Sequence, residues 1–290
     1  MKMVRSILIG LVMLGLISNV GYARQKYVQV KGSDTLINLV QRLSEVYMET
    51  HPGKAISVTG GGSGTGIAAI INDTADIANA SRLMKDKEIK KCVKKGINPM
   101  RIVIAIDALS IVINPDNPIT DLTVDQIAKI YKGEITNWSE IGGNDETINL
   151  YGRQPNSGTY DFMKKHILKG DYSPKMRQMN GNAQIVMGVE SDISGIGYVG
   201  VGYARSASGI KVVKIGKKED GPFIDPLTVS DASTYPISRS LQQYVSGEPK
   251  GNVKEFIAFE LSPKGQEIVE EEGFFPVSKA YKEVNRKAGL

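Results

Sequence analysis

Apolar residues in the first part of the chain fall into short runs and helically spaced series. Short apolar runs at residues 27–30, 55–59 and 75–80 predict strands. After the first run, apolar residues recur at intervals of three and four, which is typical of a helix with one buried face. The positions in this helix are Leu36, Leu39, Val40, Leu43, Val46 and Tyr47, and a shorter helix is predicted around Ile67, Ile70 and Ile71. Strand, loop and helix repeated in this order predict an α/β fold with mainly parallel strands.

A long apolar stretch at residues 101–114 marks a change in organisation. It is long for one strand, ends in Asn-Pro-Asp-Asn-Pro and is interpreted as the crossover into a second domain. The elements predicted there are a helix at 124–131, a strand at 149–152, a helix after Thr159 and a glycine-rich strand at 195–203. The chain then turns back over 222–236. Helices at 238–245, 252–261 and 263–271 are predicted to complete the first domain.

A domain interrupted by another predicts two lobes joined by two hinge strands, which is the geometry of a clamp that closes on a ligand. The predicted boundaries place residues 24–108 and 226–290 in lobe I and residues 109–225 in lobe II. The hinge strands are expected near residues 108–112 and 225–229.

Residues 1–23 differ from the rest of the chain. Lys2 and Arg5 precede an almost purely apolar run at 7–17, and the segment ends in Gly21-Tyr22-Ala23. This arrangement is typical of a secretory signal peptide, with cleavage expected after Ala23. A membrane anchor is the alternative, but a span needs about 20 apolar residues and this run is shorter. Since no cysteine lies near the cleavage site, the protein is predicted to be secreted without a lipid anchor.

Composition and charge give limited information about the ligand. The net charge is +5, or +3 once Lys2 and Arg5 are removed with the signal peptide, and this mild positive balance suits an anionic ligand. The densest basic stretch, 85–95, reads as an amphipathic helix with few aromatic neighbours, so a nucleic-acid site is not expected. Cys92, the single cysteine, falls on the apolar face of that helix and is interpreted as a buried thiol. With two distant histidines, His51 and His166, no metal-site spacing is present, and neither metal nor cofactor is expected.

Three predicted helices begin at turns of Ser, Thr, Asp and Gly, namely Ser33-Asp34-Thr35, Ser63-Gly64-Thr65 and Ser157-Gly158-Thr159. A helix N-terminus presents unpaired N–H groups and a partial positive charge, and hydroxyl groups add further donors. Such turns therefore predict anion sites. The alternative for each turn is simple helix capping, because Ser, Thr and Asp are favoured caps.

Two arginines stand at the ends of predicted strands close to these turns. Arg82 follows Ala80-Ser81, and Arg153 precedes Ser157 by four residues. Guanidinium groups bind tetrahedral oxyanions through paired N–H donors. A surface ion pair is the alternative for either arginine.

The chain resembles the phosphate-binding proteins of ABC phosphate importers, the PstS family. The segments that carry the resemblance are 32–36, 60–66, 75–82, 131–138, 141–143, Arg153 with 157–159, 235–239 and 262–266. The resemblance covers essentially the whole chain after residue 23. It implies the type II periplasmic-binding fold, with two α/β lobes, each a mixed, mainly parallel sheet flanked by helices, and phosphate in the cleft between them. It also implies a periplasmic location.

Site residues follow from the resemblance position by position. Those expected to bind phosphate are Thr35, Leu36 through its amide, Ser63, Arg82, Arg153, Ser157, Gly158 and Thr159, with Ser33, Asp34, Gly64 and Ser81 as further candidates. In well-known members an aspartate that accepts the phosphate proton stands where Arg82 stands here. Another aspartate, which braces the binding arginine, corresponds to Pro155. Asp34 is therefore a candidate proton acceptor, with helix capping as the alternative.

The resulting expectation is a monomeric solute-binding protein without catalytic activity. It would capture inorganic phosphate and deliver it to the permease of an ABC importer. The nearest alternative keeps the fold and binds another tetrahedral oxyanion, such as sulfate. A phosphate-ester hydrolase is disfavoured because metal ligands and a nucleophile–base pair are missing. An adhesion or signalling module stays open, because fold alone does not define function.

Overall fold

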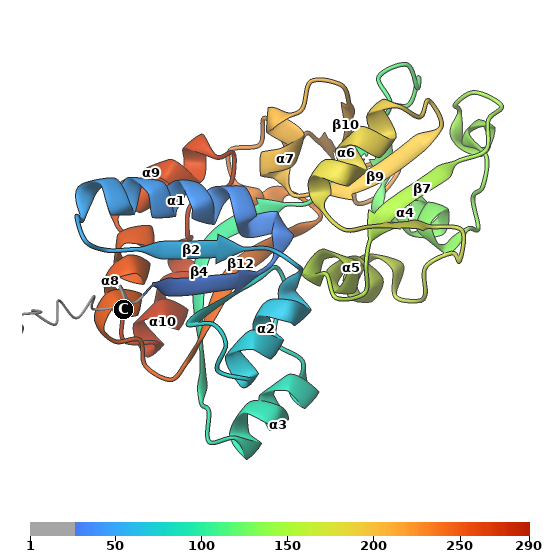
Figure 1. Ribbon diagram of the computed structural model, residues 1–290. Helices are drawn as coiled ribbons and strands as arrows, with labels where there is room; N and C mark the ends of the chain where they lie inside the picture. Colours follow the sequence, from blue (N-terminus) through green and yellow to red (C-terminus); the bar gives the residue numbers. More distant parts are fainter. Residues whose placement is uncertain (1–26) are drawn as a thin grey trace, which may run out of the picture.

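The computed structural model describes residues 27–290, and the predicted signal peptide, residues 1–23, lies outside the described residues. Two β-sheets stand side by side, and each is flanked by helices (Figure 1). The predicted α/β class with two lobes is confirmed. We call the part around the five-stranded sheet the first lobe and the part around the seven-stranded sheet the second lobe.

The first lobe contains a sheet in the order β2-β1-β3-β12-β4. Its strands are β1 (Val28–Gly32), β2 (Ile56–Thr59), β3 (Ile77–Ala80), β4 (Pro99–Ala108) and β12 (Ser238–Ser246). The first three are parallel, whereas β12 runs antiparallel to both β3 and β4. The helices of this lobe are α1 (Ile37–Thr50), α2 (Ser63–Ile71), α3 (Asp86–Lys94), α8 (Gly251–Glu260), α9 (Pro263–Glu271) and α10 (Lys279–Lys287).

The second lobe contains a sheet in the order β11-β10-β5-β9-β7-β8, with β6 paired to β10. Its strands are β5 (Ser110–Ile113), β6 (Asp121–Thr123), β7 (Asn149–Arg153), β8 (Arg177–Met179), β9 (Gly195–Val199), β10 (Lys211–Gly216) and β11 (Phe223–Ile224). Its helices are α4 (Val124–Lys132), α5 (Gly158–Phe162), α6 (Asn182–Glu190) and α7 (Val201–Ser206), and a π-helical turn, Met163–Leu168, continues α5.

The chain passes between the lobes at two neighbouring places. It changes sheets between β4 and β5, at Leu109, and returns between β11 and β12. The Leu109 amide donates to the Ile237 carbonyl over 3.2 Å, and the Tyr235 hydroxyl donates to the Leu109 carbonyl over 3.0 Å. The crossings therefore lie side by side. The exact residue boundaries of the lobes stay a prediction.

Two predicted segments have a different structure. The strand expected at 225–229 is wrong, because this segment forms a turn in which the Asp225 carboxylate accepts from the Leu227 amide over 2.8 Å. The helix expected at 238–245 is also wrong, since these residues form β12. Leu241, Tyr244 and Val245 are spaced like residues on the buried face of a helix. However, β12 lies inside the sheet and is buried on both faces.

The glycine-rich segment at 195–203 is only partly a strand. It ends as a strand at Val199 and continues as α7. Gly200 stands at this junction, where a Cβ would lie 2.8 Å from the Thr35 side chain. Close packing therefore accounts for the glycine.

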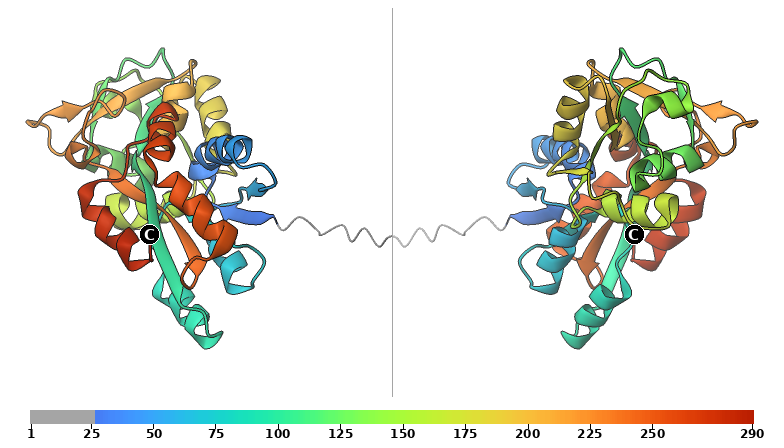
Figure 2. Two further views of the ribbon diagram at one scale, coloured as in Figure 1. Left: turned by 90° about the vertical axis from the view of Figure 1, so that its left-hand side faces the viewer. Right: turned by 90° about the vertical axis from the view of Figure 1, so that its right-hand side faces the viewer.

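The helix predicted around 85–95 is confirmed as α3, and Cys92 on it is buried. Figure 2 shows α3 and the start of β4 projecting from one end of the first lobe. Within residues 27–290, every helix is too short or too polar to span a bilayer.

Candidate functional site

Buried hydroxyl groups from both lobes meet where α2 and α5 approach each other (Figure 1). Across the contact, the hydroxyl oxygens of Thr35 and Thr159 lie 3.0 Å apart. Within the first lobe, Ser33 donates to the Ser81 hydroxyl over 3.0 Å, and the Ser63 hydroxyl lies 3.4 Å from the same oxygen. All five side chains are buried. The lobes therefore bring a cluster of hydroxyl donors together away from bulk water.

Gly158 places the start of α5 against this hydroxyl cluster. A Cβ at this position would lie 2.4 Å from Ser63 Oγ and 2.6 Å from Ser81 Oγ, so glycine is required for the approach. The first residue of a helix carries an N–H group without a partner inside the helix. For Ser63 and Gly158, no other acceptor is found within the part of the chain that the structure describes. Their amides add two donors to the cluster.

Other predicted donors are engaged by protein groups. Ser157 caps α5, because its hydroxyl oxygen accepts from the amides of Thr159 and Tyr160 at 3.1 and 3.3 Å. The capping alternative thus applies to Ser157, although its hydroxyl hydrogen is free to donate. The Leu36 amide donates to the Ser33 carbonyl over 3.1 Å.

Gly64 contributes to the contact between the lobes. Its amide donates to the Asn156 carbonyl over 2.9 Å, and the Asn156 side chain donates in turn to the Gly61 carbonyl over 2.9 Å. The glycine-rich turn of the first lobe is therefore closed over the loop that precedes α5.

Arg153 is almost fully buried at the end of β7 and contacts Asp34 across the cleft. Its Nη1 lies 3.1 Å from Asp34 Oδ1, and its Nη2 donates to the Asn180 carbonyl over 2.8 Å. Its Nε is buried without a partner among residues 27–290. Burial lowers the pKa of Arg153, and the Asp34 carboxylate opposes this effect. Capping by Asp34 of its own helical turn is not observed, since its carboxylate accepts from the second lobe.

Arg82 lies beside the cluster but is held by Glu88. Its two terminal nitrogens each donate to a carboxylate oxygen of Glu88 over 2.8 Å, and Nη1 also donates to the Leu83 carbonyl over 2.9 Å. Burial alone would raise the pKa of Glu88, but hydrogen bonds from Arg82 and the Lys85 amide outweigh it and lower that pKa. Arg82 thus forms an ion pair within the first lobe, with its Cγ 3.1 Å from the Cβ position of Gly158.

Arg239 is a site residue that sequence reasoning missed. This buried arginine contacts Asp107 through Nε at 3.1 Å and Nη2 at 2.8 Å. It also donates to the Ser81 carbonyl over 3.2 Å and to the Thr159 hydroxyl over 3.0 Å. Arg239 therefore fixes two members of the cluster, one from each lobe. Asp107 was the available signal, because it is the one charged residue between Arg101 and Asn114 and needs a buried partner.

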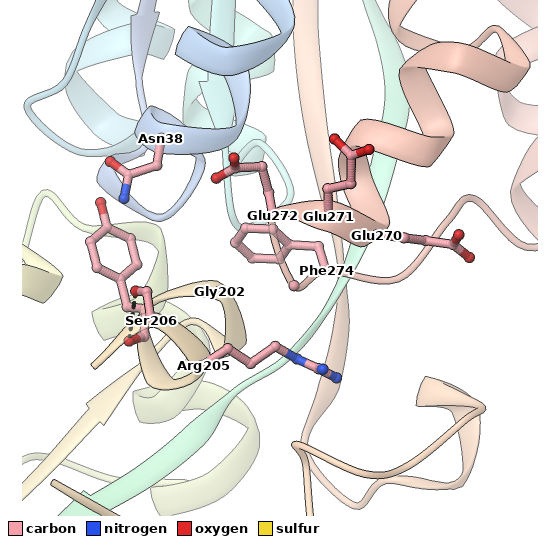
Figure 3. A pocket seen from close by; sticks show the side chains of 10 residues that line it. Asn38, Gly202, Arg205, Ser206, Glu270, Glu271, Glu272 and Phe274 are labelled. Carbon is pink, nitrogen blue, oxygen red and sulfur yellow. Dashed lines mark hydrogen bonds between the residues drawn. The ribbon is translucent and has the colours of Figure 1, made fainter. Parts of the chain in front are cut away.

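Two cavities at the contact between the lobes differ in charge. One, of about 880 Å³, has Ser81 in its wall, and its cations, Arg82, Lys85, Arg101, Lys165 and Arg239, outnumber its acids, Asp86 and Asp161. The other, of about 330 Å³, lies between α7 and the end of α9 (Figure 3). There Glu270, Glu271 and Glu272 point in different directions opposite Arg205. An anion is favoured by the first cavity and repelled by the second. Among residues 27–290, no cluster suited to a metal ion is found.

Comparison with known proteins identifies relatives over most of the chain. Residues 20–264 match the family model of the PBP superfamily domain. The phosphate-binding protein PstS of Pseudomonas aeruginosa is 34% identical over 279 residues, which cover 89% of this chain and 86% of that protein. PstS of Staphylococcus haemolyticus is 34% identical over 263 residues, covering 87% of this chain and 82% of that protein.

Solved structures agree with these relatives. A Clostridium perfringens protein, described as a phosphate ABC transporter substrate-binding protein with bound phosphate, superimposes with a TM-score of 0.78 at 29% identity. The match covers 87% of this chain and 100% of that chain. An ABC-type phosphate transport receptor from Vibrio cholerae gives a TM-score of 0.67 at 28% identity, covering 86% of this chain and 100% of that chain.

Proposed function

The chain belongs to the PstS family of phosphate-binding proteins, and from this premise we propose that it captures inorganic phosphate between its lobes and delivers it to an ABC-importer permease. The observation that carries the proposal is the convergence of buried hydroxyl donors from both lobes around Gly158. Many fixed donors in a site shielded from water favour a tetrahedral oxyanion.

The groups proposed to bind phosphate are those with an N–H or O–H that is not fully used by the protein. The Ser63 hydroxyl, the Gly158 amide and one of the Thr35 and Thr159 hydroxyls, which share a hydrogen bond, supply hydrogen bonds. The buried Nε of Arg153 supplies a charged donor. Ser81 and Ser157 extend this hydroxyl set, and Ser33 joins it only if its bond to the Ser81 hydroxyl gives way. The Leu36 and Gly64 amides and Arg82 contribute only if their present partners give way. Arg239 joins the site by holding Ser81 and Thr159.

We also propose that the protein binds phosphate without catalysing a reaction. His51 is engaged by Thr50 and Tyr47, and His166 packs on Phe162, so neither imidazole contacts a site hydroxyl. A hydroxyl nucleophile needs an adjacent base. The protein is further proposed to act as a secreted, periplasmic monomer, with its signal peptide cleaved after Ala23 and no lipid anchor.

The test uses the mature protein, residues 24–290, unfolded and refolded to release anions bound during purification. Titration calorimetry with inorganic phosphate is expected to show one site per chain and much weaker binding of sulfate. Equal binding of the two anions would instead support the alternative of a general oxyanion binder. The same preparation should not hydrolyse a phosphomonoester, with or without divalent metal. Turnover that follows the protein through purification would contradict the solute-binding role.

A further inference from the structure

The Asp34 carboxylate is bound entirely by the opposite lobe. Oδ1 of Asp34 accepts from Arg153 Nη1 at 3.1 Å, from the Asn182 amide at 2.8 Å and from the Asn182 side-chain nitrogen at 2.5 Å. Asp34 precedes α1 in the first lobe, whereas Arg153 and Asn182 belong to β7 and α6 in the second. The Tyr203 hydroxyl, from α7, also donates to the Asp34 carbonyl over 3.1 Å. One residue therefore joins three elements of the second lobe.

At α6 the Asp34 carboxylate acts as a helix cap supplied from the other lobe. Asn182 is the first residue of α6, and the preceding Gly181 has no side chain that could cap it. A carboxylate at this end satisfies a free amide and interacts favourably with the helix dipole. A Cβ at Gly181 would lie 3.0 Å from Asp34 Oδ2, so the glycine leaves room for the carboxylate.

At Arg153 the same carboxylate fixes the orientation of the guanidinium group. Asp34 holds Nη1 and the Asn180 carbonyl holds Nη2, while Nε is left buried and unpaired among the described residues. Residue 155, close to Arg153 in the chain, is proline and offers no carboxylate for this purpose. The brace therefore comes from the first lobe.

We propose that Asp34 is the positioning residue for Arg153 and that it acts only when the lobes are in contact. This inference rests on the proposed phosphate site. Alignment of Arg153, capping of α6 and closure of the lobes then form one event. Asp34 is not a reader of the phosphate proton, because Oδ1 already accepts from three donors and Oδ2 faces Gly181.

The test is Asp34→Asn, which keeps the shape of the side chain and removes its charge. Affinities for inorganic phosphate and for sulfate are both expected to fall about 30-fold, the scale of breaking one buried charged contact. The ratio of the two affinities is expected to stay within about 3-fold of wild type. In an Arg153→Gln background, most of the effect of Asp34→Asn should disappear, because the residue that it positions is gone.

A matched control is Asp161→Asn, which removes another carboxylate that pairs between the lobes, at 2.7 Å from Lys85. This change does not touch Arg153 and is expected to weaken phosphate binding by no more than about 5-fold, as for a partly exposed ion pair. The melting temperature of anion-free Asp34→Asn should match wild type within about 2 °C, because the contact forms only on closure.

The outcomes separate the two proposals. If wild type binds phosphate and Asp34→Asn binds it equally well, the positioning role is wrong while the phosphate site stands. If the variant loses phosphate but keeps sulfate, Asp34 reads the proton and the inference is overturned. A lower melting temperature without a loss of affinity would make Asp34 a purely structural residue. If the wild-type protein binds neither anion, both the proposed function and this inference are wrong.

Discussion

Arg153 is the least exposed of the three buried arginines in the described part of the chain, at 2% exposure against 7% for Arg239 and 8% for Arg82. A buried cation is stable only where its donors are used. Arg239 contacts acceptors through all three of its nitrogens, and Arg82 is held by Glu88. Arg153 keeps one N–H without a partner among these residues. A phosphate oxygen would complete its set of hydrogen bonds.

Replacing Arg153 by alanine is therefore expected to weaken phosphate binding by at least ~30-fold, because the buried anion loses a charged partner. The fold should survive, since the Arg153 backbone amide keeps its bond to the Tyr198 hydroxyl. Calorimetric titration gives the affinity, and circular dichroism verifies the fold.

The control for this change is Arg177→Ala, on β8. Its side chain is 55% exposed and lies 3.5 Å from Asp192, so the change should alter phosphate affinity by less than about 3-fold. An equally small effect at Arg153 would show that the ligand lies elsewhere.

For individual residues, the turns at the helix starts could be predicted from the sequence, but the residues that they contact could not. Ser33, Ser63 and Thr159 carry a local signal, because hydroxyl residues flanked by glycine or aspartate stand at helix starts. The role of Asp34 depends on a contact with Arg153, 119 positions away in the chain. Arg82 and Glu88 are separated by 6 positions, but only the turn before α3 brings them together. Periodicity within one element contains no information on such pairs.

Packing of β12 against α8 buries a carboxyl group outside the candidate site. Glu260, the last residue of α8, is fully buried, and its Oε1 accepts from Gln243 Nε2 on β12 at 2.9 Å. Burial raises the pKa of Glu260 to about 8. Two buried oxygens, Glu260 Oε2 and Gln243 Oε1, have no partner among the described residues. A proton on Oε2 would donate to Oε1 of Gln243 and satisfy both atoms.

Glu260→Gln is expected to remove a pH dependence of stability. The folded protein keeps the proton on Glu260 up to about pH 8, whereas the unfolded chain releases it near 4.5. The stabilisation is therefore complete below pH 4.5 and is lost as the pH rises towards 8, at about 1.4 kcal/mol per pKa unit. The variant keeps both hydrogen bonds without titrating.

Urea unfolding between pH 4.5 and 9 gives the measurement. The free energies of unfolding of variant and wild type should be similar at pH 4.5, and the variant should be more stable by several kcal/mol above pH 8. Glu267→Gln, at an exposed position of α9, should follow wild type at every pH. A constant difference across the range would mean that Glu260 is ionised in the folded state.

The same strand explains why helix and strand were confused in the sequence. β12 pairs with β3 on one side and β4 on the other, and both of its faces are covered. It therefore lacks the alternation of a half-buried strand. Its buried Gln242 and Gln243 look like solvent positions, although the Gln243 side-chain nitrogen donates to Asn79 and to Glu260. Strands with one exposed position in two, such as β1, were easier to recognise.

The described part of the molecule is two sheets joined by two adjacent crossings. The contacts between the lobes include hydrogen bonds and ion pairs, such as Thr35 with Thr159 and Lys85 with Asp161, beside apolar packing of Ile37 on second-lobe residues. The resemblance to a family predicted this two-lobed arrangement correctly. The pairs across the cleft could not be derived from spacing, since Thr35 and Thr159 are 124 positions apart. Polar contacts between domains favour relative motion.

Phosphate is expected to close the lobes and contract the molecule, and Gly158→Ala is expected to prevent the contraction. The added Cβ would lie 2.4 Å from Ser63 Oγ and 2.6 Å from Ser81 Oγ. Neither hydroxyl can move aside easily, because both are buried and Ser63 Oγ accepts from the Ser81 amide over 3.0 Å. The clash exists only when α5 meets α2, so the anion-free variant should fold normally. Gly170→Ala is the matched control, because its Cβ would have no neighbour nearer than 3.7 Å.

Small-angle scattering with and without saturating phosphate measures the effect. Wild type and Gly170→Ala should show a smaller radius of gyration with phosphate, as hinge closure around a ligand requires. Gly158→Ala should keep the radius of its anion-free form at any phosphate concentration. Identical wild-type profiles would mean that the site is closed before phosphate arrives. If Gly158→Ala contracts as wild type does, the contact between α5 and α2 is not what the closed state requires.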